Sequence, residues 1–269
     1  MIRLSNFDAV LILAGAGFSA DSNLPVFRDD GGFWNEYPPL KAIGASFEMV
    51  ASPMFQDTHE ELFAGFYAHR LTMYREIEPH DGYRLLLDKI NQAGVDYQVV
   101  TTNVDGHFIK AGYEESKVCE MHGSIHYYQC SDKACAIKRP LLKAPASLKA
   151  TTSLSPSFLP KCESCNEPLR PNIVMFNDWE YKSDRIDEAE KGYRRWINKL
   201  MEQDKKLLIL EFGAGQSVAS LRVMHNQLLM NVPEWLGVRI NTNPDHAEAS
   251  KYNMLSDTSK TLDFITKIM

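Results

Sequence analysis

The sequence predicts an α/β fold in which helices cover both faces of a parallel sheet. Three observations support this: short apolar runs typical of buried strands recur along the chain, helical stretches separate them, and glycine-rich or polar residues follow them. Apolar residues make up 44% of the 269 residues and charged residues 24%. We therefore expect one large domain with a smaller insert.

The charge and the cysteine content narrow the class of protein. A formal net charge of −6 argues against a general nucleic-acid-binding protein. No apolar run approaches the ~20 residues of a membrane span, and the first residues lack the apolar core of a signal peptide. Five cysteines in such a chain suggest reduced thiols or a metal, not a disulfide framework. We expect a cytoplasmic protein that binds no specific nucleic acid and no membrane.

The first predicted strand, residues 10–13, runs into a glycine turn at Gly15, Ala16 and Gly17. Glycine there would allow positive φ and a close approach of ligand to backbone. Residues 18–20, including Ser19, would then open a helix, giving the pattern G-x-G-x-x-A. A helix N-terminus after a strand favours a pyrophosphate, as in Rossmann-like folds. An ordinary strand-to-helix turn fits this pattern equally well when it stands alone.

The remaining elements follow in order. Residues 33–77 lack strand-like alternation and carry two predicted helices, 47–52 and 60–75. A helix over 79–93, stopped by Gly94, precedes a strand over 95–100. Further strands are predicted at 118–122, 173–176, 206–211 and 238–241, with a helix over 188–203.

We interpret these elements as two units. Residues 1–32, 77–124 and 171–269 would form a Rossmann-like nucleotide-binding domain. The helical insert 33–76 and the polar segment 125–170 would form a small second domain. A polar cluster follows the strand at 95–100, where open parallel sheets place ligand contacts at their carboxyl edge.

Four cysteines occur as two short pairs, Cys130-x₄-Cys135 and Cys162-x₂-Cys165. Two such hooks can close a tetrahedral thiolate site, so we predict one structural Zn²⁺. Its binding energy would replace a core that the polar segment cannot build. The alternative is four reduced surface cysteines. Cys119 stands apart beside a predicted strand and reads as a small buried side chain.

Residues 15–34 resemble the sirtuin family, whose pattern there is GAGxSxxSGIPxFRxxxGxW. The departures are Asn23 for glycine and Leu24 for isoleucine, and asparagine tolerates the left-handed conformation well. Residues 101–112, TTNVDGHFIKAG, are similar to the family's TQNxDGLHxxAG, and 120–123, EMHG, to its ELHG. Residues 170–176, RPNIVMF, resemble its RPxVVxFGE, and a four-cysteine module follows the histidine in the same order.

The resemblance implies an NAD-dependent protein-lysine deacylase, a deacetylase and/or desuccinylase or demalonylase, acting on acyl-lysine proteins or peptides. By that resemblance His122 is the general base, Asn103 positions the ribose and a water, and Val174 and Phe176 line the lysine tunnel. The residues implied to contact NAD are Gly15, Ala16, Gly17, Ser19, Phe27, Arg28, Thr102, Asn103, Val104, Asp105, Gly213, Ala214, Gly215 and Asn241. Departures from the family are Thr102 for glutamine, Gly213-Ala214-Gly215 for Gly-Thr-Ser, and Asn177-Asp178 for Gly-Glu.

The chemistry explains why such residues are needed. Asparagine and aspartate at a strand end can hydrogen-bond the nicotinamide amide and the ribose hydroxyls. The acyl oxygen attacks the anomeric carbon, and a base must then take a proton from a ribose hydroxyl so that this hydroxyl can attack the alkylimidate. An imidazole with an ordinary pKa near 6.5 suits this step. His107 we regard as incidental.

One helix suggests which acyl group is removed. The predicted helix 60–75 places Phe66, Tyr67, Arg70 and Tyr74 along one mostly apolar stripe. None of the helical neighbours of Arg70 is acidic, so a bound carboxylate could pair with it, helped by the Tyr67 hydroxyl. A Tyr-x-x-Arg pair is similar to that of sirtuins that remove succinyl, malonyl or glutaryl groups. The alternative is that Arg70 extends to solvent or pairs with a distant acid.

Three other functions compete with this hypothesis. An NAD glycohydrolase or mono-ADP-ribosyltransferase could use the same scaffold, and the departures from the family pattern favour it. A zinc-ribbon interaction module or nucleotide sensor would bind NAD without turnover. A dehydrogenase is the weakest alternative, because no acidic residue stands ~20 positions after the glycine turn at the end of a second strand.

Overall fold

The computed structural model describes residues 2–24, 36–216, 219–250 and 252–269. Its centre is a six-stranded sheet in the order β3-β2-β1-β7-β8-β9, and every neighbouring pair is parallel. This confirms the predicted α/β fold. The strands are β1 (Ala9–Ala14), β2 (Asp96–Thr101), β3 (Val118–Glu120), β7 (Leu207–Phe212), β8 (Leu236–Ile240) and β9 (Met254–Asp257).

The strand order reverses at β1. From β1 the chain goes to β2 and β3 on one side, and later to β7, β8 and β9 on the other. In register, Ala14 pairs with both Thr101 and Phe212, so the carboxyl ends of β1, β2 and β7 meet at one edge. Ligands of open α/β sheets bind at such a switch point. The glycine turn after β1 lies there.

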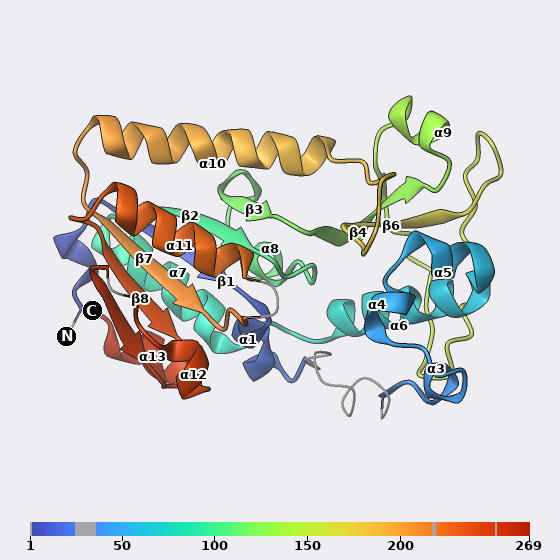
Figure 1. The fold of residues 1–269 in the computed structure, drawn as a ribbon, viewed down its shortest axis with the longest axis horizontal. Coiled ribbons are helices and arrows are strands. Elements are labelled where there is room, and N and C mark those ends of the chain that lie inside the picture. The colour runs from blue at the N-terminus through green and yellow to red at the C-terminus, as the bar shows by residue number, and fades with distance from the viewer. Residues whose placement is uncertain (1, 25–35, 217–218, 251) are drawn as a thin grey trace.

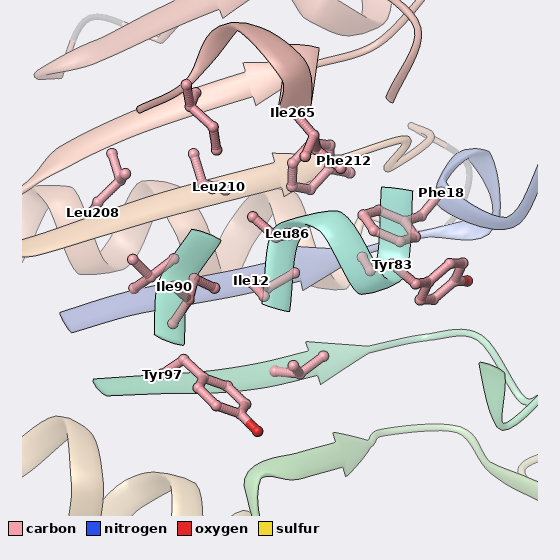
Figure 2. Packing of buried hydrophobic residues seen from close by; sticks show 14 of the residues in the cluster. Ile12, Phe18, Tyr83, Leu86, Ile90, Tyr97, Leu208, Leu210, Phe212 and Ile265 are labelled. Atoms are coloured by element: carbon pink, nitrogen blue, oxygen red, sulfur yellow. The ribbon is translucent and has the colours of Figure 1, made fainter. Parts of the chain in front are cut away.

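Helices cover both faces of the sheet (Figure 1). On one face α7 (Asp81–Ala93) and α13 (Thr261–Lys267) pack, and Figure 2 shows Leu86 and Ile90 of α7 facing Ile12 and Leu208. On the other face α10 (Asp184–Glu202) and α11 (Ser220–Asn231) meet Leu11, Leu13 and Ile209. The strand side chains alternate between these two cores, as the period of two requires.

A second, three-stranded sheet has the order β5-β4-β6 and is antiparallel. It consists of β4 (Gly123–Cys130), β5 (Leu142–Lys143) and β6 (Leu169–Ile173). The predicted strand 173–176 was therefore misplaced, because the strand ends at Ile173 and pairs with β4. Polar residues such as His126 and Gln129 interrupt the apolar pattern of β4, which explains why the sequence did not reveal it.

The 36–76 segment is helical, as predicted, and packs beside the small sheet (Figure 1). It contains α3 (Pro38–Ala42), α4 (Phe47–Val50), α5 (Pro53–Thr58) and α6 (Glu60–Glu76). The remaining helices within the described residues are α1 (Ala16–Ser19), α8 (His107–Lys110), α9 (Lys133–Ile137) and α12 (Pro244–Ala247), with 3₁₀ turns at Leu4–Asn6, Ala20–Ser22 and Glu115–Lys117. None of the helices in the described ranges is long and apolar enough to cross a membrane.

Candidate active site

The glycine turn differs from the prediction in one respect. Gly15 has φ −98°, and Gly17 is also not among the glycines with positive φ, whereas Gly213 has φ +58°. The need for glycine comes from packing: a Cβ on Gly17 would lie 2.6 Å from the Cα of Gly213, and one on Gly15 would lie 2.7 Å from the Gly213 oxygen. The turns after β1 and β7 thus touch backbone to backbone. Helix α1 is a single turn rather than a longer helix.

A buried hydrogen-bond network joins the β1 turn to the end of β2. The Ser19 hydroxyl donates to Asp105 Oδ2 at 2.7 Å and accepts from Asn103 Nδ2 at 3.0 Å. Asn103 Nδ2 also donates to the Gly15 oxygen, and the Tyr83 hydroxyl lies 2.9 Å from Ser19 Oγ. Buried polar networks that are satisfied in this way hold their members in one orientation. The network fixes Asn103 and Asp105 at the cavity wall.

A cavity of about 390 Å³ opens beside this network. Of the residues predicted to bind or react, eleven line it: Ala16, Ser19, Tyr67, Arg70, Thr102, Asn103, Val104, Asp105, His122, Val174 and Phe176. They come from five separate parts of the chain, so the fold brings them together. Six further lining residues were not predicted as site residues: Leu24, Phe47, Ala51, Tyr74, Ile173 and Met175. Tyr74 shares the α6 stripe that drew attention to Arg70, so its signal was present in the sequence.

The other described residues predicted to contact the nucleotide do not line this cavity. Gly15 and Gly17 contact Gly213 at the carboxyl edge of the sheet. Asn241 Nδ2 donates to the Ala214 oxygen at 3.3 Å, which joins the ends of β7 and β8. Gly215 follows in the same loop and does not line the cavity. Phe27 and Arg28 lie outside the described residues.

His122 lies between β3 and β4, where the chain leaves the parallel sheet for the small one. Its carbonyl oxygen accepts a hydrogen bond from Val174 N at 2.9 Å. Val174, one of the two residues predicted to line the lysine tunnel, is therefore tied to the backbone of the predicted base, whereas Phe176 N donates to the Ala51 oxygen at 2.9 Å. Both are 43% exposed and follow the end of β6.

The α6 stripe faces the cavity with Tyr67, Arg70 and Tyr74. Arg70 Nε donates to the Tyr74 hydroxyl at 3.0 Å, Nη2 donates to the same oxygen, and the guanidinium lies over the rings of Phe66 and Tyr74. Burial raises the pKa of Tyr67 and of Tyr74, so both present neutral hydroxyls. The structure thus adds Tyr74 as a partner of Arg70.

The four predicted metal-binding cysteines come together beside β4 and α9. Their Sγ atoms all lie within 4.8 Å of one another, with Cys130–Cys165 at 3.4 Å and Cys135–Cys162 at 3.7 Å. Tetrahedral thiolates about 2.3 Å from zinc lie about 3.8 Å apart, so this donor set fits. The backbone N–H groups of Ser164 and Cys165 lower the pKa of the Cys162 thiol to about 7. The cluster is consistent with a zinc site.

Of two histidines near the site, His107 is buried and His126 is half-buried. His107 is 0% exposed, and its backbone N–H donates to Asp105 Oδ1 at 2.9 Å. His126 Nε2 lies 2.8 Å from the backbone carbonyl oxygen of Asp105, and the imidazole ring packs against Gly106. Burial lowers the pKa of both imidazoles, which favours their neutral forms. His107 is therefore part of the packing beneath Asp105, not a surface residue.

These features define an α/β protein with a cavity at the switch point of its parallel sheet, lined by a polar cluster and an apolar wall, and with a separate four-thiol cluster. Residues 15–198 match the model of the Sir2 family. The chain belongs to this family, the sirtuins.

Two curated relatives carry the name NAD-dependent protein deacylase. An NAD-dependent protein deacylase of Aquifex aeolicus is 31% identical over 184 residues, which are 68% of this chain and 66% of that protein. The one of Thermococcus sibiricus is 31% identical over 169 residues, 63% of this chain and 60% of that protein. The chain thus matches somewhat less than two thirds of the length of these relatives.

One relative matches a longer part of the chain. A probable bifunctional ADP-ribose hydrolase/ADP-ribosyltransferase of Fusarium oxysporum is 29% identical over 237 residues, 84% of this chain but 39% of that protein. Among solved structures, a Sir2 homologue in complex with NAD has a TM-score of 0.68 at 23% identity and covers 98% of this chain and 88% of that chain. This likeness concerns the fold.

Proposed function

We propose that the chain is an NAD-dependent protein-lysine deacylase that releases nicotinamide and O-acyl-ADP-ribose. The observation that carries this proposal is the cavity itself, which collects Asn103, Asp105 and His122 at the switch point of the sheet. The family and the names of the curated relatives support it. Its substrates would be acyl-lysine proteins or peptides, with NAD as co-substrate.

The roles proposed for these residues are those that the family resemblance implies, and their positions support them. Asp105, held by Ser19, would accept hydrogen bonds from the nicotinamide amide, and Asn103 would orient the ribose and a water. His122 would take a proton from a ribose hydroxyl. The glycine turns around Gly15 and Gly213 would receive the pyrophosphate side of the dinucleotide.

We infer that the four-cysteine cluster holds one structural Zn²⁺. Cys130, Cys135, Cys162 and Cys165 would supply four thiolates, and such a closed site leaves no position for substrate. The ion would hold together the segment between β4 and β6. Its contribution would be folding free energy and not chemistry.

We further infer that the cavity accepts negatively charged acyl groups, such as succinyl, besides acetyl. Arg70 supports this because a guanidinium lies in the cavity wall among apolar and aromatic side chains. Two neutral hydroxyls, from Tyr67 and Tyr74, line the same wall. A carboxylate placed there would receive charge-assisted hydrogen bonds.

Transfer of ADP-ribose to another acceptor, or NAD hydrolysis, is a second candidate function. The longer match to the Fusarium protein favours it, as do Thr102, the Gly213-Ala214-Gly215 turn and Asn177-Asp178. His122 opposes it, because transfer to an outside acceptor does not need attack on an imidate.

Nicotinamide release with and without an acyl-lysine peptide separates the two functions. We expect release only with the peptide, and we expect His122→Ala to lose deacylation while still binding NAD. Release that does not depend on the peptide would favour hydrolysis or transfer. Identical turnover by the His122→Ala protein and its parent would contradict the role of this histidine.

A further inference from the structure

Two buried arginine–carboxylate pairs lie in different parts of the molecule, and neither takes part in the proposed chemistry. Arg239 pairs with Glu211 in the parallel sheet, and both are at most 3% exposed. Arg170 pairs with Asp178 beside the small sheet, and the side chains are 1% and 0% exposed. Burying such charges is expensive, and apolar residues of similar volume often stabilise a fold equally well. Stability alone therefore does not explain these pairs, and the segments that each pair holds in place indicate its role.

The Glu211 pair lies under the loops that follow β7 and β8. Arg239 Nε and Nη2 donate to the two oxygens of Glu211 at 2.6 and 3.1 Å, and His225 Nδ1 lies 2.8 Å from Glu211 Oε2. Helix α11 presents Arg222, His225 and Asn226 on one face toward these strands. These hydrogen bonds keep the Glu211 carboxyl ionised, so its pKa lies below the usual value despite burial.

The arginines of this cluster also reach the loop after β8. Arg239 Nη1 donates to the backbone carbonyl oxygen of Glu248 at 2.9 Å, and Arg222 Nη1 donates to that of His246 at 2.6 Å. Gln216 Nε2 donates to the Asp245 oxygen at 3.1 Å, from the loop after β7. Side chains of β8, α11 and the loop after β7 thus hold the backbone of residues 245–248. This loop follows Asn241, which hydrogen-bonds the Gly213-Ala214-Gly215 turn where the nucleotide would bind.

The Arg170 pair holds the segment after β6. Arg170 Nη1 and Nη2 donate to the two oxygens of Asp178 at 2.6 and 2.9 Å, and Nη1 contacts Met175 Sδ. Between these points lie Val174 and Phe176, which line the cavity, and Phe176 N donates to the Ala51 oxygen. The pair therefore closes residues 170–178 into a fixed bend at the acyl-lysine side.

We propose that the two pairs are separate positioning devices: Glu211–Arg239 sets the affinity for NAD, and Arg170–Asp178 sets the affinity for the acyl-lysine peptide. This inference rests on the proposed function for the identity of the two ligands. It predicts that the two affinities can be changed independently, because the pairs hold different loops and share no residue.

The test exchanges each pair for apolar residues, since removing one partner alone would leave a buried charge and unfold the protein. The variants are Glu211→Leu/Arg239→Met and Arg170→Met/Asp178→Leu, and each is the matched control for the other. Thermal unfolding checks that both are folded. Calorimetric dissociation constants are then measured for NAD⁺ and for one peptide in acetyl-lysine and succinyl-lysine forms, which requires no turnover.

We expect the Glu211→Leu/Arg239→Met protein to bind NAD⁺ about tenfold more weakly, with peptide binding changed by less than about twofold. The Arg170→Met/Asp178→Leu protein should show the reverse. Equal changes of both constants in each folded variant, or no change in either, would overturn the inference. A parent that binds both probes without turnover would contradict the proposed function and leave this comparison valid. A parent that binds neither would overturn both.

Discussion

The proposed acceptance of negatively charged acyl groups rests on single residues. Arg70 places a cation in the cavity wall, and its Nε and Nη2 donate to the hydroxyl of Tyr74, one turn further along α6. The stripe was visible in the sequence because its members recur at helical spacing. The hydrogen bond to Tyr74 was not, because spacing alone does not decide between Tyr67 and Tyr74 as the partner.

Replacing Arg70 by methionine should depress desuccinylation far more than deacetylation. Loss of a charge-assisted contact costs about 1.5–3 kcal/mol, so kcat/KM for a succinyl-lysine peptide should fall roughly 10- to 100-fold. Methionine suits the apolar surroundings, so the acetyl-lysine peptide serves as the internal control for folding. Equal losses on both peptides would reject the assignment of Arg70.

At the scale of elements, the position of α6 depends on one close contact. A Cβ on Gly65 would lie 1.9 Å from the Leu154 oxygen, so the helix and the 149–157 loop touch backbone to backbone. Leu154 is 1% exposed and has φ +60°, so its backbone has little freedom to move away from α6. Helix α6 also carries Arg70 and Tyr67, which line the cavity.

Gly65→Ala should therefore destabilise the protein by about 1–3 kcal/mol through overpacking. Gly192→Ala is the matched control, since Gly192 lies within α10 and has nothing within 4 Å of its Cβ position. There alanine should stabilise by roughly 0.5–1 kcal/mol, because it restricts the unfolded chain. Urea unfolding of both variants measures the difference. A Gly65→Ala protein as stable as the parent would refute the contact.

The elements that the sequence did not predict share a physical reason. The core face of α11 carries Arg222 and His225, which conceal the apolar period, and these make sense only opposite Glu211 and Arg239. The antiparallel strand β4 is interrupted by polar residues, and β9 is a short edge strand. By contrast β1 and β7 are buried on both faces and were predicted nearly to the residue.

The candidate site was predictable to a similar degree. The motif residues around Asn103 and His122 line the cavity as expected, because they follow strand ends at one edge of the sheet. The apolar wall residues, such as Phe47 and Met175, come from segments whose approach depends on tertiary packing. The reason for the glycines at 15 and 17, contact with Gly213, was also invisible before the strands were paired.

At the scale of the whole molecule, buried histidines make stability depend on pH. Burial lowers the pKa of five imidazoles from the ordinary value of 6.5: His69, His80, His107, His126 and His225. As pH falls through 6.5, the unfolded chain takes up protons before the folded chain does. The free energy of unfolding should therefore fall between pH 7.5 and pH 5.5.

One carboxyl opposes this trend. Burial raises the pKa of Glu120 to about 7, against the effect of Arg185, so this group favours the folded state at lower pH. Glu120→Gln should then steepen the loss of stability on acidification. Urea midpoints of the parent and this variant at pH 7.5 and 5.5 measure both effects. A parent whose midpoint rises as pH falls would show that the histidines are not what governs stability here.

The fate of the ADP-ribose tests the proposed deacylation most directly, and mass spectrometry of the reaction products reports it. The metal-loaded protein is incubated with NAD and with acetyl- and succinyl-lysine peptides. We predict deacylated peptide and O-acyl-ADP-ribose in equal amounts, with the acyl mass matching the peptide supplied. Unmodified ADP-ribose together with an unreacted acyl-lysine peptide would contradict the proposed deacylation. So would NAD that stays intact throughout the incubation.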